Sequence, residues 1–339
     1  MPLSDLRFLQ LNSWLNQVFA SQSHPVLISG DASFRRYFRV LHDETSYIVM
    51  DSPPEQIPVS PFIKLAKAYG DLGINVPQVI ESNVEDGFLL LSDLGDVQLI
   101  SRLNDTSVEA YYSRALKLLD RFAAFTENAE LGLPLYDSVF VHRELDIFTD
   151  WLIKHHLNLV IDADTRKMLE QAFALLVANA EEQPKVGMHR DYHSRNLMLT
   201  ADEFGVEQLS VIDFQDAVIG PVTYDAVSLL RDCYIRWPDT LVEGLMEKHY
   251  LNQKQAGLID SSVTLEKYRR WFDLMGIQRH IKAAGIFSRL NYRDGKPAYM
   301  ADIPMTLAYI ADISAGYPEL EDFSAWVTNT LVPAFEDKL

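Results

Sequence analysis

The fold of this chain is decided by one stretch, His189-Arg190-Asp191-Tyr192-His193-Ser194-Arg195-Asn196, and by the run Leu209-Ser210-Val211-Ile212-Asp213-Phe214 that follows it. The apolar run Leu197-Met198-Leu199 and the segment Gln208 to Ile212 flank a polar turn, Thr200 to Glu207, that contains Gly205. This pattern predicts two short strands paired as an antiparallel hairpin. Asn196 then enters one strand where Asp213 leaves the other, so the two side chains should converge.

Asp191, Asn196 and Asp213 are the residue types that phosphoryl transfer to a hydroxyl group requires. One carboxylate orients the acceptor hydroxyl and takes its proton, while other oxygen ligands hold Mg2+ on the phosphates. We expect Asp191 to be the base, and Asn196 and Asp213 to bind Mg2+, which prefers oxygen ligands. The alternative is a polar loop in which the aspartates only form turns. That alternative leaves the apolar flanks and the asparagine unexplained.

The spacing His-x-Asp-x-x-x-x-Asn followed by Ile-Asp-Phe resembles the aminoglycoside phosphotransferase and choline kinase family, relatives of the protein kinases. The resemblance implies an α+β, protein-kinase-like bilobal fold with a small β-rich N-lobe and a larger, mainly helical C-lobe. It implies ATP and Mg2+ as cofactors. We expect His189 to orient the catalytic loop and Asp225 to support it. Asp225 can equally mark a helix start, because a carboxylate there favours the helix dipole, and both roles can hold at once.

Composition limits the classes of partner. With 339 residues and 48% hydrophobic content, the chain can form two domains or lobes. A net charge of -18 argues against nucleic-acid and anionic-membrane partners, since these surfaces attract Lys and Arg. The sequence has no signal-like start, no run of roughly 18 apolar residues and a single cysteine, Cys233. We expect a cytoplasmic protein that acts on a small molecule and needs no obligate protein partner.

The order of patterns predicts where the lobes meet. Near-helical apolar spacing predicts a helix from Leu6 to Phe19. Further patterns predict strands over 26–29, 34–40, 47–50, 77–81 and 87–91, with a helix over 61–72 between them. We therefore expect an N-terminal nucleotide-binding lobe over 1–91, a polar hinge over 92–96, and a helical C-terminal lobe over 97–339 that carries the catalytic loop and the acceptor site.

The segment Gly30-Asp31-Ala32-Ser33-Phe34-Arg35-Arg36 lies between two predicted strands, where the fold places the loop that covers the ATP phosphates. Because it has one glycine, we expect Ser33, Arg35 and Arg36 to supply part of the contact. A plain hairpin with a basic strand is the alternative. Adenine is expected to bind backbone groups around Leu91, Ser92 and Asp93.

The next strand departs from the wider family, because Met50 and Asp51 stand where a phosphate-binding lysine is expected. We hypothesise that an arginine of the preceding strand, or Lys64 reaching in from the following helix, neutralises the phosphates instead. Near-normal nucleotide affinity in both Arg36→Ala and Lys64→Ala variants would exclude this.

One branch of the family is especially similar. The segments Val49-Met50-Asp51-Ser52-Pro53-Pro54-Glu55 and Phe287-Ser288-Arg289-Leu290-Asn291-Tyr292-Arg293-Asp294-Gly295-Lys296-Pro297 look like the bacterial anomeric kinases of N-acetylmuramate and N-acetylglucosamine, used in cell-wall peptidoglycan recycling. The resemblance spans roughly residues 5 to 330 and includes the missing lysine. It implies phosphorylation of the C1 hydroxyl of an amino sugar by ATP.

Sugar recognition requires hydrogen-bonding side chains and a flat apolar surface. Arg289, Arg293 and Lys296 are candidates for binding the lactyl carboxylate of a muramic acid, because a guanidinium can bind a carboxylate through two hydrogen bonds. Solvated faces and salt bridges are the common alternative for such charges. The other candidate substrate-binding residues are Arg143, Glu144, Trp151 and Tyr292.

Two other functions remain open at this point. The same catalytic set can serve another small alcohol, such as an aminoglycoside, a choline-like alcohol or homoserine, although the basic cluster near Arg293 favours an anionic acceptor. A nucleotide-binding scaffold without turnover is suggested by the missing strand lysine. The intact trio of Asp191, Asn196 and Asp213 argues against it.

Overall fold

The structure is a computed structural model that describes residues 5–30, 34–125, 131–202 and 204–338. The chain forms two compact units. Unit 1 contains Met1–Ser101 and Arg195–Gln215, and unit 2 contains Arg102–Ser194 and Asp216–Leu339. The expected hinge at 92–96 lies inside unit 1, and the hairpin expected in the C-terminal lobe groups with the N-terminal unit. This difference arises because the hairpin strands pair with segments of that unit.

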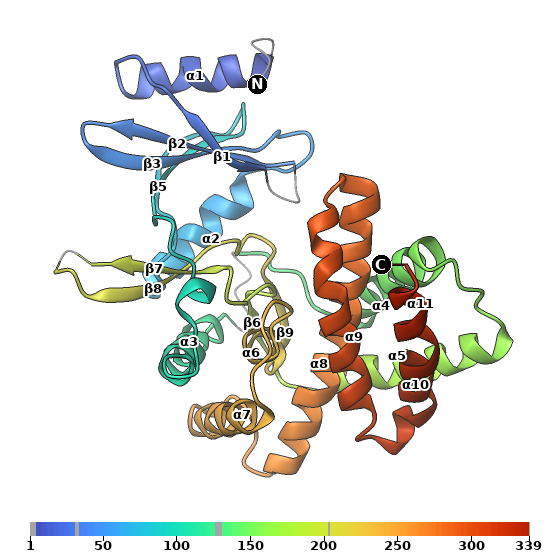
Figure 1. Ribbon diagram of the computed structural model, residues 1–339. Helices are drawn as coiled ribbons and strands as arrows, with labels where there is room; N and C mark the ends of the chain where they lie inside the picture. Colours follow the sequence, from blue (N-terminus) through green and yellow to red (C-terminus); the bar gives the residue numbers. More distant parts are fainter. Residues whose placement is uncertain (1–4, 31–33, 126–130, 203, 339) are drawn as a thin grey trace. The chain divides into compact units, whose positions relative to one another are not determined.

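The described part of unit 1 contains a five-stranded antiparallel sheet in the order β1-β2-β3-β5-β4 (Figure 1). Its strands are β1 Val26–Gly30, β2 Arg36–His42, β3 Thr45–Asp51, β4 Val79–Asn83 and β5 Phe88–Ser92. Asp51 pairs with Arg36 on one side and with Phe88 on the other. The β-rich N-terminal region expected from the sequence is therefore confirmed.

Helix α1, Leu6–Val18, covers one face of this sheet (Figure 1). It begins where the side chain of Asp5 accepts a hydrogen bond from the Phe8 N–H, which caps one of the unpaired amides of the first turn. Leu11 and Leu15 are fully buried against sheet residues that include Phe38 and Phe88. Burial of these large apolar side chains is the main source of stability for this layer.

Helix α2, Ser60–Asp71, carries a proline at its first turn and buries Phe62 and Tyr69. The rings of these two residues contact Phe214 with centroid distances of 4.8 and 5.5 Å. Phe214 directly follows Asp213, so aromatic packing holds the chain just beyond a predicted metal ligand.

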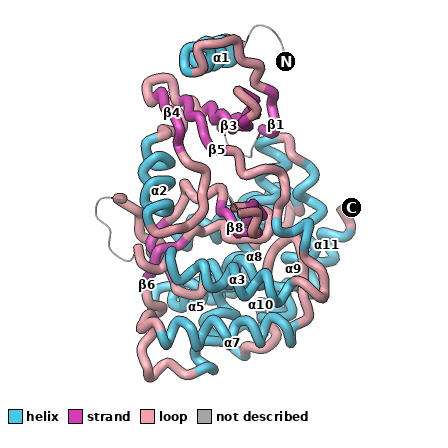
Figure 2. Tube along the Cα trace, turned by 90° about the vertical axis from the view of Figure 1, so that its left-hand side faces the viewer, coloured by secondary structure: helices cyan, strands magenta, loops and turns pink. Residues whose placement is uncertain are grey.

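Unit 2 is mainly helical, as expected. Its longer helices are α3 Val108–Phe122, α4 Ser138–Ile147, α5 Ala163–Glu182, α7 Asp239–Gln255, α8 Leu265–Asp294 and α9 Ile303–Ser314. Its shorter helical segments are η2 Phe148–His156, α6 Tyr224–Leu230, η3 Pro297–Asp302, η4 Pro318–Leu320, α10 Glu321–Trp326, η5 Val327–Leu331 and α11 Val332–Glu336, and η1 Leu99–Arg102 spans the boundary between the units. Helices α3 and α7 run side by side (Figure 2), and α9 runs along α8 (Figure 1). In the described part of the chain, no helix combines the length and apolar content that a membrane span requires.

Helix α8 forms the spine of unit 2. It begins at Thr264, whose hydroxyl accepts a hydrogen bond from the Lys267 N–H, and it ends at Gly295 in the left-handed region with φ 65°. Within it, a Cβ on Gly285 would lie 2.5 Å from the backbone nitrogen of Phe148. Only glycine allows this approach, so α8 lies directly against the junction of α4 and η2.

A short antiparallel pair, β6 Lys185–Met188 and β9 Val218–Pro221, lies among these helices. The catalytic-loop segment His189 to Ser194 begins where β6 ends, and α6 follows β9. The pair thus brings residues from two separate stretches of sequence to one end of a small ladder.

Candidate active site

The loop after β6 is held at both ends by carboxylates of unit 2. The backbone N–H groups of His189 and Arg190 donate to Asp225 at 2.6 and 2.9 Å. The backbone N–H of Ser194 donates to Asp232 at 2.9 Å. Arg190 has φ 80°, in the left-handed region that is strained for a residue with a side chain, a strain that clusters at functional sites.

Asp225 is buried, and burial raises the pKa of its carboxyl to about 7 despite the two N–H donors. Its two hydrogen bonds to the loop are those expected of a residue that supports the loop. Asp225 also lies in the first turn of α6. Both interpretations from the sequence therefore fit the geometry. His189 is fully buried and its ring contacts Phe122 edge-on at 5.8 Å.

Asp191, the expected base, lies beside a buried lysine. The Nζ of Lys282 is 3.5 Å from Asp191 Oδ1 and 3.1 Å from the Tyr224 hydroxyl. About one third of the Asp191 side chain remains exposed, at 34%. Burial raises the pKa of Asp191, but the positive charges of Lys282 and Arg190 outweigh it and leave that pKa well below its usual value. The carboxylate is therefore ionised and able to accept a proton at neutral pH.

Glu144 joins the cations around Asp191 into one buried network. Its carboxylate accepts hydrogen bonds from Tyr136 at 2.5 Å, Arg190 at 2.9 Å and Gln278 at 3.0 Å, and it lies 3.4 Å from Lys282. Glu144 is only 3% exposed. Burial raises the pKa of Glu144, and Lys282 and Arg190 reverse that effect and lower it. We expected Glu144 to bind the sugar, whereas its carboxylate is occupied here by Tyr136, Arg190 and Gln278.

The two expected metal ligands belong to unit 1. Strands β7 Leu197–Ala201 and β8 Glu207–Val211 pair with Leu197 opposite Val211, which confirms the hairpin predicted from the sequence. At its end, the Ile212 N–H donates to the Asn196 carbonyl at 3.0 Å, and Asn196 Nδ2 lies 3.5 Å from Asp213 Oδ2. Asp213 has φ 63°. The hairpin therefore brings the asparagine and the aspartate together.

Further contacts fix this end of the hairpin. Gln215 Nε2 donates to Asp213 Oδ1 at 2.6 Å. The carbonyl of Asn75 accepts from the Val211 N–H at 2.8 Å, and its side-chain amide donates to Ser210 at 2.6 Å and Thr200 at 3.2 Å. A loop near α2 thereby anchors the hairpin within unit 1.

The donor set at Asn196 and Asp213 suits Mg2+. The described residues contain no group of three or more His, Cys, Asp or Glu side chains placed to hold a metal ion. Mg2+ does not need such a cage, because it keeps several waters and is held by one or two carboxylates together with substrate phosphates. One carboxylate and one amide oxygen meet that requirement.

The expected phosphate-binding residues are placed less favourably. Gly30 ends β1, while residues 31–33, including Ser33, lie outside the described residues. Arg36 donates through Nε to Asp51 at 2.9 Å and also binds Asp5. Asp51 is fully buried and also accepts from Arg7 at 2.9 Å. The acid that stands in place of the strand lysine is thus neutralised by two arginines, so Arg36 is committed to carboxylates.

Arg35 and Lys64 differ in exposure. Arg35 is 7% exposed, whereas Lys64 lies on the exposed side of α2. Of the hypothesised replacements for the strand lysine, Lys64 is the one whose side chain faces solvent.

The expected adenine-binding segment is largely engaged by its own unit. Leu91 is buried in β5 and lies opposite Ile48 and Val79 in the neighbouring strands. The Ser92 N–H donates to the Gln78 carbonyl at 2.9 Å. The Asp93 carboxylate accepts from Arg39 at 2.6 Å. The contacts of Ser92 and Asp93 with adenine stay a prediction.

Several expected acceptor residues gather between η2 and α8. The rings of Trp151 and His155 lie 5.4 Å apart, and those of His155 and Tyr292 lie 4.3 Å apart. Arg293 is bound by its neighbour Asp294 at 2.9 Å. Arg289 lies on α8 and is half-buried. The remaining candidates are elsewhere: Arg143 is exposed, with its guanidinium 5.1 Å from the Phe140 ring centre, and Lys296 follows the end of α8.

Lys282 and Asp232 contact the loop that carries Asp191, and Gln278 donates to Glu144. None of the three was singled out from the sequence. In sequence, Lys282 looks like any helical lysine. The signal available was that Gln278 and Lys282 lie on one face of a helix whose apolar residues surround them, which indicates burial.

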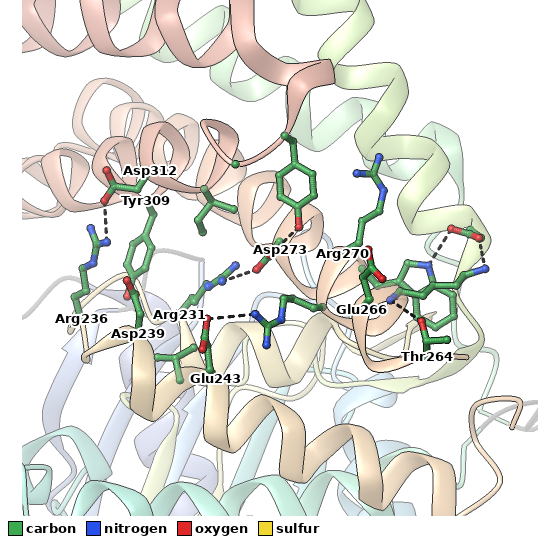
Figure 3. Close-up of a pocket in the computed structure, with 18 residues that line it drawn as sticks. Arg231, Arg236, Asp239, Glu243, Thr264, Glu266, Arg270, Asp273, Tyr309 and Asp312 are labelled. Carbon is green, nitrogen blue, oxygen red and sulfur yellow. Dashed lines mark hydrogen bonds and ion pairs between the residues drawn. The ribbon is translucent and has the colours of Figure 1, made fainter. Parts of the chain in front are cut away.

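A separate cavity of about 890 Å³ lies in unit 2, lined by residues of α7, α8, α9 and their neighbours (Figure 3). Its charged side chains pair with one another: Arg231 with Asp273 at 2.6 Å, Arg236 with Asp312 at 2.8 Å and Lys267 with Glu182 at 2.5 Å. Figure 3 shows the pairs of Arg231 with Asp273 and of Arg236 with Asp312 at the cavity wall. None of the expected site residues lines it. The charged side chains that line this cavity therefore join neighbouring segments of unit 2 through ion pairs.

Comparison with known proteins agrees with this geometry. Residues 25–256 match the model of the phosphotransferase enzyme family. The chain is 39% identical to the N-acetylmuramate/N-acetylglucosamine kinase of Pseudomonas aeruginosa over 94% of this chain and 95% of that protein. It is 37% identical to the protein of the same name in Neisseria meningitidis over 93% of each.

Solved structures share the fold at low sequence identity. A Plasmodium vivax ethanolamine kinase has a TM-score of 0.64 and 14% identity, covering 91% of this chain and 87% of that chain. An ADP-bound aminoglycoside phosphotransferase has a TM-score of 0.60 and 14% identity, covering 90% and 98%. These likenesses confirm the kinase-like fold expected from the sequence. With the family match and the near-full-length identity, they show that the chain belongs to the phosphotransferase enzyme family.

Proposed function

We propose that this chain is an ATP- and Mg2+-dependent kinase that phosphorylates the anomeric C1 hydroxyl of N-acetylmuramate and N-acetylglucosamine in peptidoglycan recycling. The observation that carries the proposal is 37 to 39% identity, over 93 to 95% of the chain, to three proteins that bear the name of this kinase. The ADP-bound relative supports nucleotide use. The single cysteine and the use of ATP support a cytoplasmic location.

In this proposal Asp191 accepts the proton of the C1 hydroxyl. The sugar oxygen forms a bond to the γ-phosphorus, the bond from that phosphorus to the bridging oxygen breaks, and ADP leaves. The ionised Asp191 next to Lys282 is a weak base. Weak basicity suffices because a hemiacetal hydroxyl is more acidic than an ordinary alcohol and because phosphoryl transfer depends mainly on alignment and charge neutralisation.

Asn196 and Asp213 would hold Mg2+, which would neutralise charge on the phosphates. Asp225, Asp232 and Glu144 would act through the loop and keep Asp191 in place. Lys64 remains our candidate for neutralising phosphate on the nucleotide side, because it is exposed on α2 whereas Arg36 is bound to Asp51 and Asp5.

Cationic acceptors fit less well. Choline-like alcohols and aminoglycosides carry positive charge, whereas Lys282, Arg190 and Arg279 all act electrostatically on Asp191 and lower its pKa. An acceptor that binds next to these groups should be neutral or anionic, since like charges repel.

The test is ATP consumption with Mg2+ against N-acetylmuramate, N-acetylglucosamine, choline and kanamycin, with Asp191→Asn as control. We expect turnover with the two sugars only, and none with the 1-O-methyl glycoside of N-acetylglucosamine, whose C1 oxygen is blocked. Turnover of the blocked glycoside would exclude C1 as the acceptor. Binding of ATP without turnover of any acceptor would favour a nucleotide-binding scaffold.

A further inference from the structure

Helix α8 presents several cations near the catalytic loop, and they differ in their partners and exposure. The guanidinium of Arg279 also has nitrogens without a hydrogen-bond partner, but Arg279 is only 5% exposed and lies over the ring of Tyr224, whereas Arg289 is half-buried. Lys282 is paired with Glu144 and Asp191, and Arg293 is held by Asp294. Arg289 has no ion pair among the described residues, and its Nε is buried without a hydrogen-bond partner. A buried guanidinium nitrogen in this state carries a desolvation cost that a bound anion would offset.

The surroundings of Arg289 are electropositive. Its pKa is lowered by burial first and then by Arg293, with Arg190 acting in the same direction, and Asp294 opposes them. Arg190 is the residue next to the expected base, and its own charge is taken up by Glu144. Arg289 thus lies within electrostatic range of the catalytic loop. The neighbouring cations and burial together outweigh the opposing charge of Asp294.

The helix geometry relates Arg289 to Asp191. Arg289 follows Lys282 by two turns on the same face of α8, about 10.5 Å along the axis. Helical side chains lean toward the N-terminus, so Arg289 leans back toward the turn of Lys282. Lys282 contacts Asp191 at 3.5 Å. The spacing matches a sugar whose C1 hydroxyl is at the base and whose substituent extends along α8.

Aromatic side chains border the same stretch of helix. Tyr292 lies one turn beyond Arg289 on the same face, and its ring contacts His155 of η2 at 4.3 Å. The close approach at Gly285 holds α8 and η2 together at this level. A flat apolar surface next to an uncompensated guanidinium suits an amino sugar that carries a carboxylate.

We infer that Arg289 binds the lactyl carboxylate of N-acetylmuramate and thereby makes the enzyme select this anionic sugar over N-acetylglucosamine. The inference rests on the proposed function and adds the residue that discriminates between its two substrates. The sugars differ in the lactyl ether alone, so the difference in transition-state binding falls on the group that meets it. Of the three cations considered from the sequence, Arg289 is chosen because Arg293 is bound by Asp294 and Lys296 lies beyond the end of the helix.

The experiment compares kcat and KM for both sugars in the wild type, Arg289→Gln, Arg289→Lys and the control Arg293→Gln. We expect Arg289→Gln to lower kcat/KM for N-acetylmuramate by roughly 10- to 100-fold, mainly through KM, and to change that for N-acetylglucosamine by less than about 2-fold. Arg289→Lys should recover part of the loss, since it restores the charge without the planar fork. Arg293→Gln should leave the ratio between the sugars unchanged.

A second measurement needs no variant. In the wild type, the kcat/KM for the methyl ester of N-acetylmuramate should be as low as that for N-acetylglucosamine, because the ester keeps the bulk of the lactyl group and loses its charge. Equal losses for both sugars in Arg289→Gln and Arg289→Lys, or an ester as good as the acid, would overturn the inference. If the wild type turned over neither sugar, the proposed function itself would fail. If the wild type turned over both sugars and the Arg289 variants kept the same ratio of kcat/KM between them, only the role of Arg289 would be excluded.

Discussion

The loop that carries Asp191 and the hairpin that carries Asn196 and Asp213 are consecutive in sequence but are held by different kinds of contact. His189 is bound to Asp225, 36 residues away, and Asp191 lies against Lys282, 91 residues away. In the hairpin, Asn196 meets Asp213 at a separation of 17 residues, and Thr200 meets Ser210 at a separation of 10. Short-range pairing costs little chain entropy, whereas the loop requires a folded helical unit around it.

The comparison also concerns charge. The loop is stabilised by a network of buried ions in which Glu144 compensates two cations, and the hairpin is stabilised by backbone ladder bonds and neutral side chains. Removing one member of a buried ion network leaves the others uncompensated, which costs more than losing a neutral hydrogen bond. Substitutions in the two regions should therefore differ in their effects.

The largest effect is expected at the base. Asp191→Asn keeps the shape of the side chain and removes its proton acceptor, so kcat should fall by roughly 10²- to 10⁴-fold. ADP affinity, measured by calorimetry, should be unchanged because this loop is not expected to bind the nucleotide base. A loss of kcat below about tenfold would remove Asp191 from the role of general base.

At the hairpin, Asp213→Asn should lower kcat by about 10²-fold and raise the Mg2+ concentration needed for half-maximal activity, because a charged ligand becomes neutral. Gln215→Ala keeps the ligand and removes the donor at 2.6 Å, so its effect should be smaller, about tenfold. Titration of activity with Mg2+ checks both variants. An unchanged Mg2+ requirement in Asp213→Asn would contradict the assignment.

The two regions should also differ in how much a substitution lowers the free energy of unfolding. Glu144→Gln should lower the free energy of unfolding by about 3–5 kcal/mol, since Arg190 would remain buried without its counter-charge and Lys282 would keep only Asp191. Asn75→Ala, which removes neutral hydrogen bonds to the hairpin, should cost about 1 kcal/mol. Urea unfolding measures both, and Glu109→Gln in an exposed pair serves as a control without measurable change. Equal losses of unfolding free energy for Glu144→Gln and Asn75→Ala would contradict the expected difference between the loop and the hairpin.

The pH dependence of kcat should report the cations around the loop. Lys282 helps to hold the pKa of Asp191 below its usual value, so protonation of the base should not limit kcat down to about pH 4. In Lys282→Met that pKa rises, and the acid side of the profile should move to higher pH. Lys267→Met, at the cavity in Figure 3, is the matched control and should leave the profile in place.

The lowered pKa of Asp191 also makes the stability of the folded state depend on pH. A carboxylate with a depressed pKa stabilises the folded state above its unfolded pKa and loses that contribution as pH falls through the folded value. An acid limb that stays in place in Lys282→Met would show that Lys282 is not needed and that other cations, such as Arg190 and Arg279, keep the pKa of Asp191 low.

The smallest effect is expected on the nucleotide side. Lys64→Ala should raise KM for ATP by about 5- to 10-fold if this exposed lysine replaces the missing strand lysine. Lys67→Ala is the control, because Lys67 lies on the same helix and is paired with Asp71 at 2.6 Å. Indistinguishable KM values in the two variants would leave the phosphates to other groups of unit 1.

The hairpin shows how far sequence reasoning reaches. The apolar run 197–199 and the segment 208–212, on either side of a polar turn with Gly205, predict both strands. The observed register, from Leu197 opposite Val211 to Ala201 opposite Glu207, confirms them. Apart from Asp225, the residues that hold the loop were not found from the sequence. Glu144 was expected to meet the sugar, and it lies instead in a buried network with Lys282, because a charge in a helix does not reveal by itself whether it faces water.

By itself, the sequence determined the kinase-like fold, the order of strands and helices in outline and the hairpin, since these depend on local periodicity and on a short motif. The same motif predicts the roles of Asp191, Asn196 and Asp213. Only the tertiary structure decided that the hairpin groups with the N-terminal sheet and that Arg36 binds Asp51. It also decided which guanidinium nitrogens of α8 are buried without a hydrogen-bond partner among the described residues. The physical reason is that pairing and burial of charges depend on residues far apart in sequence, and a folded chain alone brings them together.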